Sequence, residues 1–104
     1  MHILDEEDTI TVVPSVMSAE RIAYDVYRAA RESARQPEYG PGHFRFAVRC
    51  RNEAEAKGLV SEVEGLIVRL VFEHGESDGI VHDSTDAYYS TGVASWFIII
   101  QLNT

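Results

Sequence analysis

The stretch from His43 to Arg51, HFRFAVRCR, decides the fold because it contains the cleanest two-residue alternation in the chain. Successive side chains of a β-strand point to opposite faces. One face would carry Phe44, Phe46, Val48 and Cys50. The other would carry His43, Arg45, Ala47, Arg49 and Arg51. The pattern therefore predicts a strand with one face in a core and one face in water.

The arginines of this strand stand out because the 104-residue chain has a formal net charge of −8. The formal charge is −5 over residues 1–20, +4 over residues 21–51 and −7 over residues 52–104. The chain therefore has a basic pole, residues 21–51, and an acidic pole formed by the other two segments. Two interpretations stay open: the basic strand meets an acidic edge of another copy, or the poles are neutralised by salt bridges within one chain. The acidic total argues against nucleic acid or an anionic membrane as a partner.

Two amphipathic helices are expected on either side of this strand. A short strand at Thr9–Val13 would stop at Pro14, and Ser15 or Ser18 would cap a helix that ends by Pro37, before a tight connection at Glu38–Gly42. After the arginine strand, Asn52 would cap a second helix and Glu55 would complete a capping box. Its apolar residues recur at helical spacing to about His74, and Gly75 would stop it.

Gly58 and Gly65 lie inside the second helix and, seven residues apart, face nearly the same way. Glycine within a helix costs about 0.5 to 1 kcal/mol relative to alanine. Either the glycines let another backbone approach closely, from the sheet or a neighbouring subunit, or they are tolerated surface residues.

The C-terminal part predicts a brief strand at Gly79–His82, a turn-rich loop at Asp83–Gly92 and a final strand at residues 93–103. In the final strand, one face would carry Ala94, Trp96, Ile98, Ile100 and Leu102, and the other Phe97 and Ile99. A strand that is apolar on both faces is buried on both or meets a partner, and we expect a subunit interface. The adjacent Tyr88 and Tyr89 with Trp96 would form a contact patch or a loop packed over the helix ends.

We expect an α+β fold: a single domain over residues 1–104 with a small, mainly antiparallel sheet and two helices packed on one face, in the order β-α-β-α-β-β. Residues 1–8, which end in four consecutive acids, are expected to form a solvated, flexible tail.

No grouping of residues predicts an enzyme, and we expect no catalytic, cofactor or metal site. Cys50 is the only cysteine, shares the apolar strand face, and faces away from His43. The group His82, Asp83 and Asp86 matches no spacing of metal ligands. The glycines at 40 and 42 precede a strand, whereas phosphate-binding loops open a helix.

From His43 to Thr104 the chain resembles the tail terminator, or tail-completion, proteins of long-tailed bacteriophages. The likeness is carried by FRFAVRCRNEAEAKGLVSEVEGLI, a charged strand followed by an acidic-capped helix, and by HDSTDAYYSTGVASWFIIIQLNT, an Asp-rich stretch with a closing strand. The resemblance implies a structural protein without catalysis. It would form a ring, commonly six-fold, that caps the tail tube and joins it to the head.

The expected partners are thus further copies of the chain and other tail or head-tail connector proteins, in the virion or the bacterial cytoplasm. The start of the chain lacks the pattern of a signal peptide, and no stretch has the length of a membrane span. The expected interface consists of Arg45, Arg49, Arg51, Tyr88, Tyr89, Phe97 and Ile99. The alternative is a small acidic binding or regulatory module, such as an inhibitor of a host protein, which would pair its arginines internally and expose Glu62 and Glu64.

Overall fold

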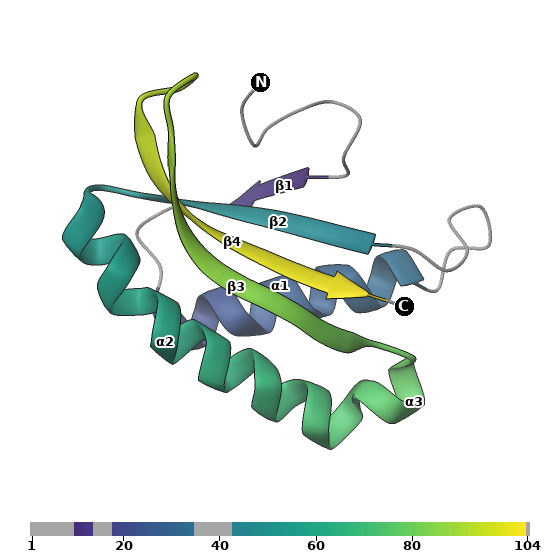
Figure 1. Cartoon of the computed structure of the whole chain (residues 1–104). Coiled ribbons are helices and arrows are strands. Elements are labelled where there is room, and N and C mark those ends of the chain that lie inside the picture. The colour runs from purple at the N-terminus through teal and green to yellow at the C-terminus, as the bar shows by residue number, and fades with distance from the viewer. Residues whose placement is uncertain (1–9, 14–17, 35–42, 104) are drawn as a thin grey trace.

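The predicted arginine strand is β2 (His43–Cys50), and it lies inside a four-stranded sheet of order β1-β2-β4-β3. The computed structural model of the chain describes residues 10–13, 18–34 and 43–103. Strand β1 (Ile10–Val13) runs parallel to β2, whereas β4 (Ser95–Asn103) pairs antiparallel with both β2 and β3 (Val81–Ser90) (Figure 1). The predicted α+β class and mainly antiparallel sheet are confirmed.

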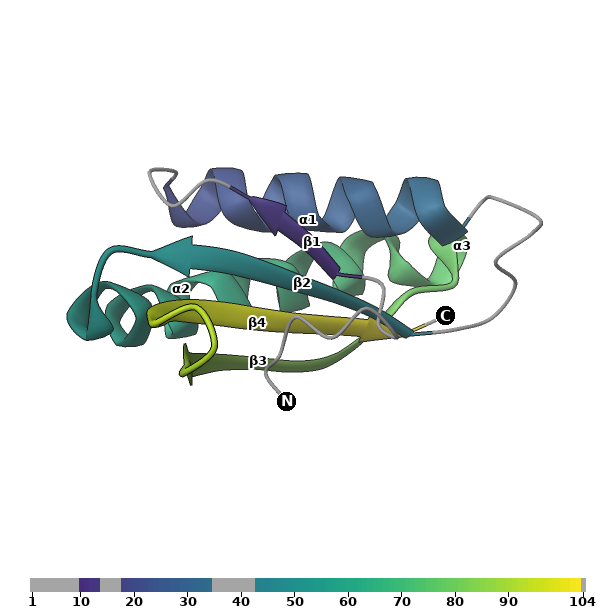
Figure 2. The same cartoon turned by 90° about the horizontal axis from the view of Figure 1, so that it is seen from above.

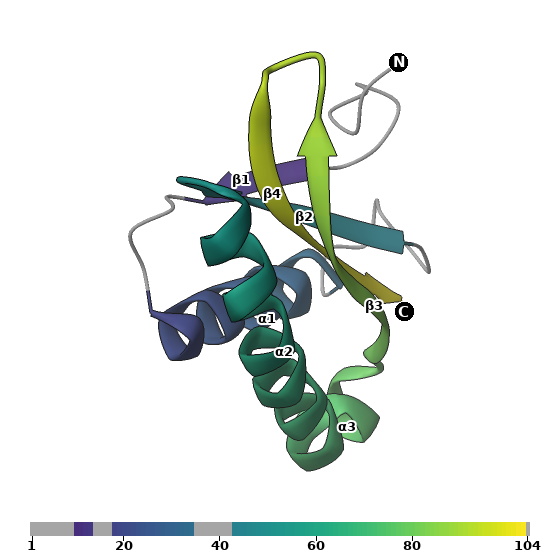
Figure 3. The ribbon, with the colours of Figure 1, turned by 60° about the vertical axis from the view of Figure 1, so that its left-hand side comes forward.

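Helices α1 (Ala19–Ala34) and α2 (Glu53–Leu70) lie side by side on one face of the sheet, as predicted (Figures 2 and 3). The first helix begins after Ser18, whose Oγ accepts a hydrogen bond from the backbone N–H of Arg21 at 3.2 Å. The second begins after Asn52, whose Oδ1 accepts from the N–H of Glu55 at 2.8 Å. Both caps satisfy a first-turn N–H that has no partner within its helix.

The core fills the space between the helices and the facing side of the sheet. Strand β2 contributes Phe44, Phe46, Val48 and Cys50, and β4 contributes Ile98, Ile100 and Leu102. The helices cover them with Ile22, Val26, Val63 and Ile67. The predicted alternation of β2 is confirmed, and Cys50 is a core residue.

The second helix does not stop at Gly75, and this prediction is wrong. The helical chain continues as a π-helical segment, η1 (Val71–Gly75), and a last turn, α3 (Glu76–Asp78), and it ends at Gly79, whose φ is 72°. A Cβ on Gly75 would lie 2.5 Å from the carbonyl oxygen of Ile80. Gly75 is therefore required for close packing, and Gly79 supplies the left-handed conformation that ends the helix.

The predicted turn-rich loop at Asp83–Gly92 is also wrong, because most of it belongs to β3. The strand has an irregularity between His82 and Ser84, after which Thr85, Ala87 and Tyr89 pair with Ile100, Ile98 and Trp96. The polar composition predicted turns, but the apolar β4 offers a full row of hydrogen-bonding partners, and only alternate side chains of β3 have to face the helices.

The final strand begins at Ser95 and not at residue 93, since Ala94 lies in the connecting turn with φ 51°. The remaining faces of β4 are as predicted. The predicted tail at residues 1–8, the alternative cap Ser15, the stop at Pro37 and the connection Glu38–Gly42 lie outside the described residues. Within residues 10–13, 18–34 and 43–103, no helix has the length and hydrophobicity to cross a membrane.

Candidate interaction surfaces

The sheet face that points away from the helices carries two of the three predicted arginines. Arg49 is exposed, and its Nη2 donates to Ser95 Oγ at 2.8 Å. Arg45 is half-buried, and its Nη2 lies 3.5 Å from Gln101 Oε1. Both side chains reach from β2 toward β4, and Arg49 makes no ion pair with any residue that the structure describes.

Arg51 does not belong to this surface, although the alternation of the sequence placed it there. It follows the end of β2, and its Nη2 lies 2.6 Å from Glu55 Oε2 in the first turn of α2. The backbone N–H of Arg51 also donates to Glu55 Oε1 at 2.8 Å, so the predicted capping box closes on Arg51 instead of Asn52. These hydrogen bonds hold the pKa of Glu55 below its usual range.

Between the arginines, the same sheet face has an apolar centre made of Ala47, Phe97 and Ile99, with Tyr88 packed against it. Phe97 and Ile99 are only 2% and 4% exposed in the single chain. The expectation that they need another copy to bury them is therefore not supported, because a strand apolar on both faces is here buried on both. Among the described side chains, Arg49 and Asp86 are exposed on this face, and Val81, which pairs with Asn103, is 56% exposed.

The predicted tyrosine patch is divided between the two sides of the sheet. Tyr88 joins the apolar centre with Phe97, whereas Tyr89 faces the helix side, with its ring centroid 5.5 Å from that of Trp96. Lys57 Nζ lies 5.6 Å from the Trp96 centroid. Adjacent strand residues point to opposite faces, so the two tyrosines cannot form one contact patch.

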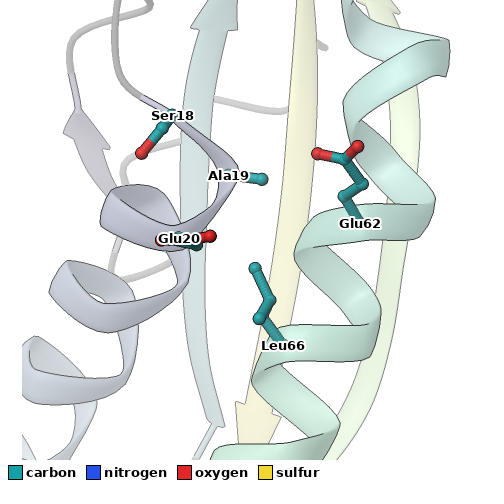
Figure 4. A pocket seen from close by; sticks show the side chains of 5 residues that line it. All are labelled: Ser18, Ala19, Glu20, Glu62 and Leu66. Carbon is teal, nitrogen blue, oxygen red and sulfur yellow. The ribbon is translucent and has the colours of Figure 1, made fainter.

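On the helix side, a groove runs between α1 and α2. One cleft of about 350 Å³ is lined by Ser18, Ala19, Glu20, Glu62 and Leu66 (Figure 4). A second cleft of about 250 Å³ shares Glu20 and Leu66 and extends past Tyr24 and Arg69 to Glu73. Carboxylates above an apolar floor suit a lysine or arginine side chain of another protein. Sequence reasoning missed this groove because the two helices are far apart along the chain.

Three ion pairs among the described residues are local to a helix. Arg21–Asp25, Lys57–Glu53 and Arg69–Glu73 each link residues four apart, with N–O distances of 3.0 to 3.1 Å. Such exposed pairs contribute a few tenths of a kcal/mol each. Arg51–Glu55 joins the basic segment 21–51 to the acidic segment 52–104, while Arg49 has no acidic partner among the described residues.

The candidate chemical groups form no reactive cluster in the described part of the chain. His82 Nε2 lies 2.8 Å from Thr85 Oγ1, and no three histidine, cysteine, aspartate or glutamate side chains there could hold a metal ion. Burial raises the pKa of the Cys50 thiol to about 11, so the thiolate is scarcely populated near pH 7.

Gly58 and Gly65 face open space, since a Cβ added to either would meet nothing within 4 Å. The sheet does not approach them, and that part of the close-approach hypothesis is wrong. Comparison with protein-family models, with curated proteins and with solved structures found no match to this chain.

Proposed function

We propose that this protein is a non-enzymatic structural subunit that works by self-association, as a ring-forming tail terminator or tail-completion protein of a long-tailed bacteriophage. In this role it caps the tail tube, joins it to the head and acts in the virion, after assembly in the bacterial cytoplasm. The resemblance of residues 43–104 to that family is the reason for naming the phage tail. The confirmed order β-α-β-α-β-β is consistent with it.

The observation that carries self-association is the separation of charge between the two sides of the molecule. The outer sheet face presents Arg49 without an ion pair among the described residues, and Asp86 is exposed on the same face. The groove on the helix side is lined by Glu20, Glu62 and Glu73, with Arg69 paired to Glu73. Arg49 on one side and the carboxylates Glu20 and Glu62 on the other fit a head-to-tail contact. Such a contact closes a ring when its rotation permits.

The first experiment is the solution mass by light scattering over a concentration series. The proposal expects a closed oligomer, or a monomer that associates as the concentration rises. A strict monomer at every concentration contradicts it.

Arg49→Glu tests the surface directly. Reversing this charge should lower the association constant roughly tenfold at low ionic strength and less at high salt, where exposed charges are screened. The matched control is Arg21→Glu, which makes the same charge change on the exposed side of α1. If Arg49→Glu associates like the parent at every salt concentration, the sheet face is not an interface.

A second candidate function is the small acidic binding module, for example an inhibitor that occupies a basic site on a host protein. It is favoured by the acidic groove of Figure 4, by the exposure of Glu62 and Glu64, and by the pairing of Arg51 with Glu55. This function predicts a strict monomer whose binding to a basic partner is lost in Glu20→Lys and Glu62→Lys. The light-scattering series separates the two.

A further inference from the structure

The solvent side of α2 carries an uncharged stripe where a surface helix ordinarily carries charge. The buried side of the helix is formed by Ala56, Val63 and Ile67. Directly opposite lie five exposed residues of α2, and none is charged: Ala54, Gly58, Ser61, Gly65 and Val68. Phe72 follows them in the π-helical segment η1. Phe72 is 89% exposed and Val68 is 46% exposed, so the stripe ends in accessible apolar surface.

The stripe has the spacing of a coiled-coil seam. Its members are separated by four, three, four and three residues, which is the alternation of the a and d positions of a heptad. Gly58 and Gly65 occupy a positions, and Ala54, Ser61 and Val68 occupy d positions. Phe72 has no heptad position, because it lies in the π-helical turn that follows α2. Since a Cβ at either glycine would meet nothing in this chain, the packing of the single chain does not require glycine there. A second helix that approaches closely would require glycine at these two positions.

The charged residues beside the stripe indicate which partner helix has complementary charges. Lys57 and Glu64 occupy the g positions, and Glu62 and Arg69 occupy the e positions. In a parallel, in-register pair, each g residue meets the e residue five positions later in the other helix. Lys57 would then meet Glu62 of a second copy, and Glu64 would meet Arg69 of that copy, so both contacts join opposite charges.

We infer that α2 pairs with α2 of a second copy of this chain, parallel and in register, through the Ala54–Val68 stripe. This contact lies on the helix layer and does not use Arg49, but its e residues Glu62 and Arg69 also line the groove of the head-to-tail contact proposed above. The glycines let the backbones approach, and Val68 buries apolar surface at the C-terminal end of the seam. An 18-residue helix is only about 27 Å long, so the pair is weak and forms at high protein concentration.

Charge exchange between positions 64 and 69 tests the pairing by analytical ultracentrifugation. Glu64→Arg and Arg69→Glu should each raise the dissociation constant of the dimer about tenfold, because each places like charges across the seam. The double variant restores opposite charges and should return to within about threefold of the parent. Residues five apart do not face each other on one helix, so this rescue cannot arise within a single chain.

Crosslinking gives a second measurement that does not rely on charge. Ser61→Cys should form a disulfide-linked dimer under mild oxidation, because parallel pairing puts the two position-61 side chains together. Asp86→Cys, also exposed but on the opposite face of the sheet, is the control and should stay monomeric. The native Cys50 is buried and does not compete.

The inference is overturned if the single variants dimerise like the parent, or if the double variant is as weak as they are. It is also overturned if Ser61→Cys crosslinks no faster than Asp86→Cys. Repeating the series in the Arg49→Glu background separates this contact from the sheet face. If Arg49→Glu removes the larger oligomer and leaves a dimer that the α2 variants weaken, the helix pairing is supported. If the remaining dimer is unaffected by the α2 variants, the helix pairing alone is rejected.

Discussion

At the scale of single residues, Gly75 shows how the lack of a side chain allows two backbone segments to pack closely at the end of the helix. A Cβ there would lie 2.5 Å from the Ile80 carbonyl oxygen and 2.9 Å from Val71 Cγ1. The Ile80 N–H donates to the Gly75 carbonyl oxygen at 2.9 Å, so the two backbones are held together. Moving either group would break the contact that joins the end of the helix to β3.

Gly75→Ala should therefore destabilise the protein by about 2 kcal/mol, as overpacking of a tight site does. The matched control is Gly65→Ala, where an added methyl group meets open space. That variant should raise the stability of the dilute monomer by about 0.5 to 1 kcal/mol, because alanine favours a helix over glycine. Urea unfolding of both variants measures the difference, and equal effects of the two would contradict this assignment.

At the scale of elements, Tyr27 ties α1 to the end of the helical chain after α2. Its hydroxyl donates to Asp78 Oδ2 at 2.7 Å, although the two residues are 51 positions apart. Burial, and then this hydrogen bond to the Asp78 carboxylate, raise the pKa of Tyr27 far above its usual value near 10. The neutral phenol is the form that the folded state requires.

Tyr27→Phe should cost about 1 kcal/mol at neutral pH through loss of this hydrogen bond. The pH dependence has a definite sign. Because the folded pKa is raised, the contribution of Tyr27 is complete below pH 10 and is lost as the pH rises above that value. Denaturant unfolding from pH 8 to 11 should show a steeper loss of stability in the parent than in Tyr27→Phe. Parallel curves would argue against a buried phenol–carboxylate pair.

At the scale of the whole molecule, the sheet has buried apolar side chains on both faces, so an aromatic residue can be buried on the face that the helices do not cover. Phe97 is 2% exposed on the outer sheet face, and Phe72 is 89% exposed on the helix layer. The alternation of the final strand placed Phe97 at an expected interface, whereas Phe72 falls within the range of the expected second helix. In the single chain Phe97 is buried and Phe72 is accessible.

Phe97→Ala should lower the free energy of unfolding by about 3 kcal/mol, because a buried aromatic side chain leaves a cavity. Phe72→Ala should change it by no more than about 0.5 kcal/mol in a dilute sample. Thermal and urea unfolding of the two variants give the comparison. A mild effect of Phe97→Ala would mean that this face of the sheet is not part of the core.

The amino-acid sequence by itself determined the elements whose pattern is local. Neighbours within a few residues set each of these features: the alternation of β2, the helix caps at Ser18 and Asn52, the two helical stripes and the apolar β4. The core position of Cys50 was equally predictable. The order of elements and their class followed, because each amphipathic face had to be covered.

Tertiary structure alone decided the features that depend on residues far apart in sequence. The polar β3 is a strand because β4 supplies its hydrogen bonds, and Tyr88 and Tyr89 are separated by that strand. Phe97 is buried without a second copy. Arg51 is the exception, since its ion pair with Glu55, only four residues away, is a local contact that the strand alternation did not predict. Periodicity predicts which face a side chain shares, but what covers that face is a question of packing, and packing is not local.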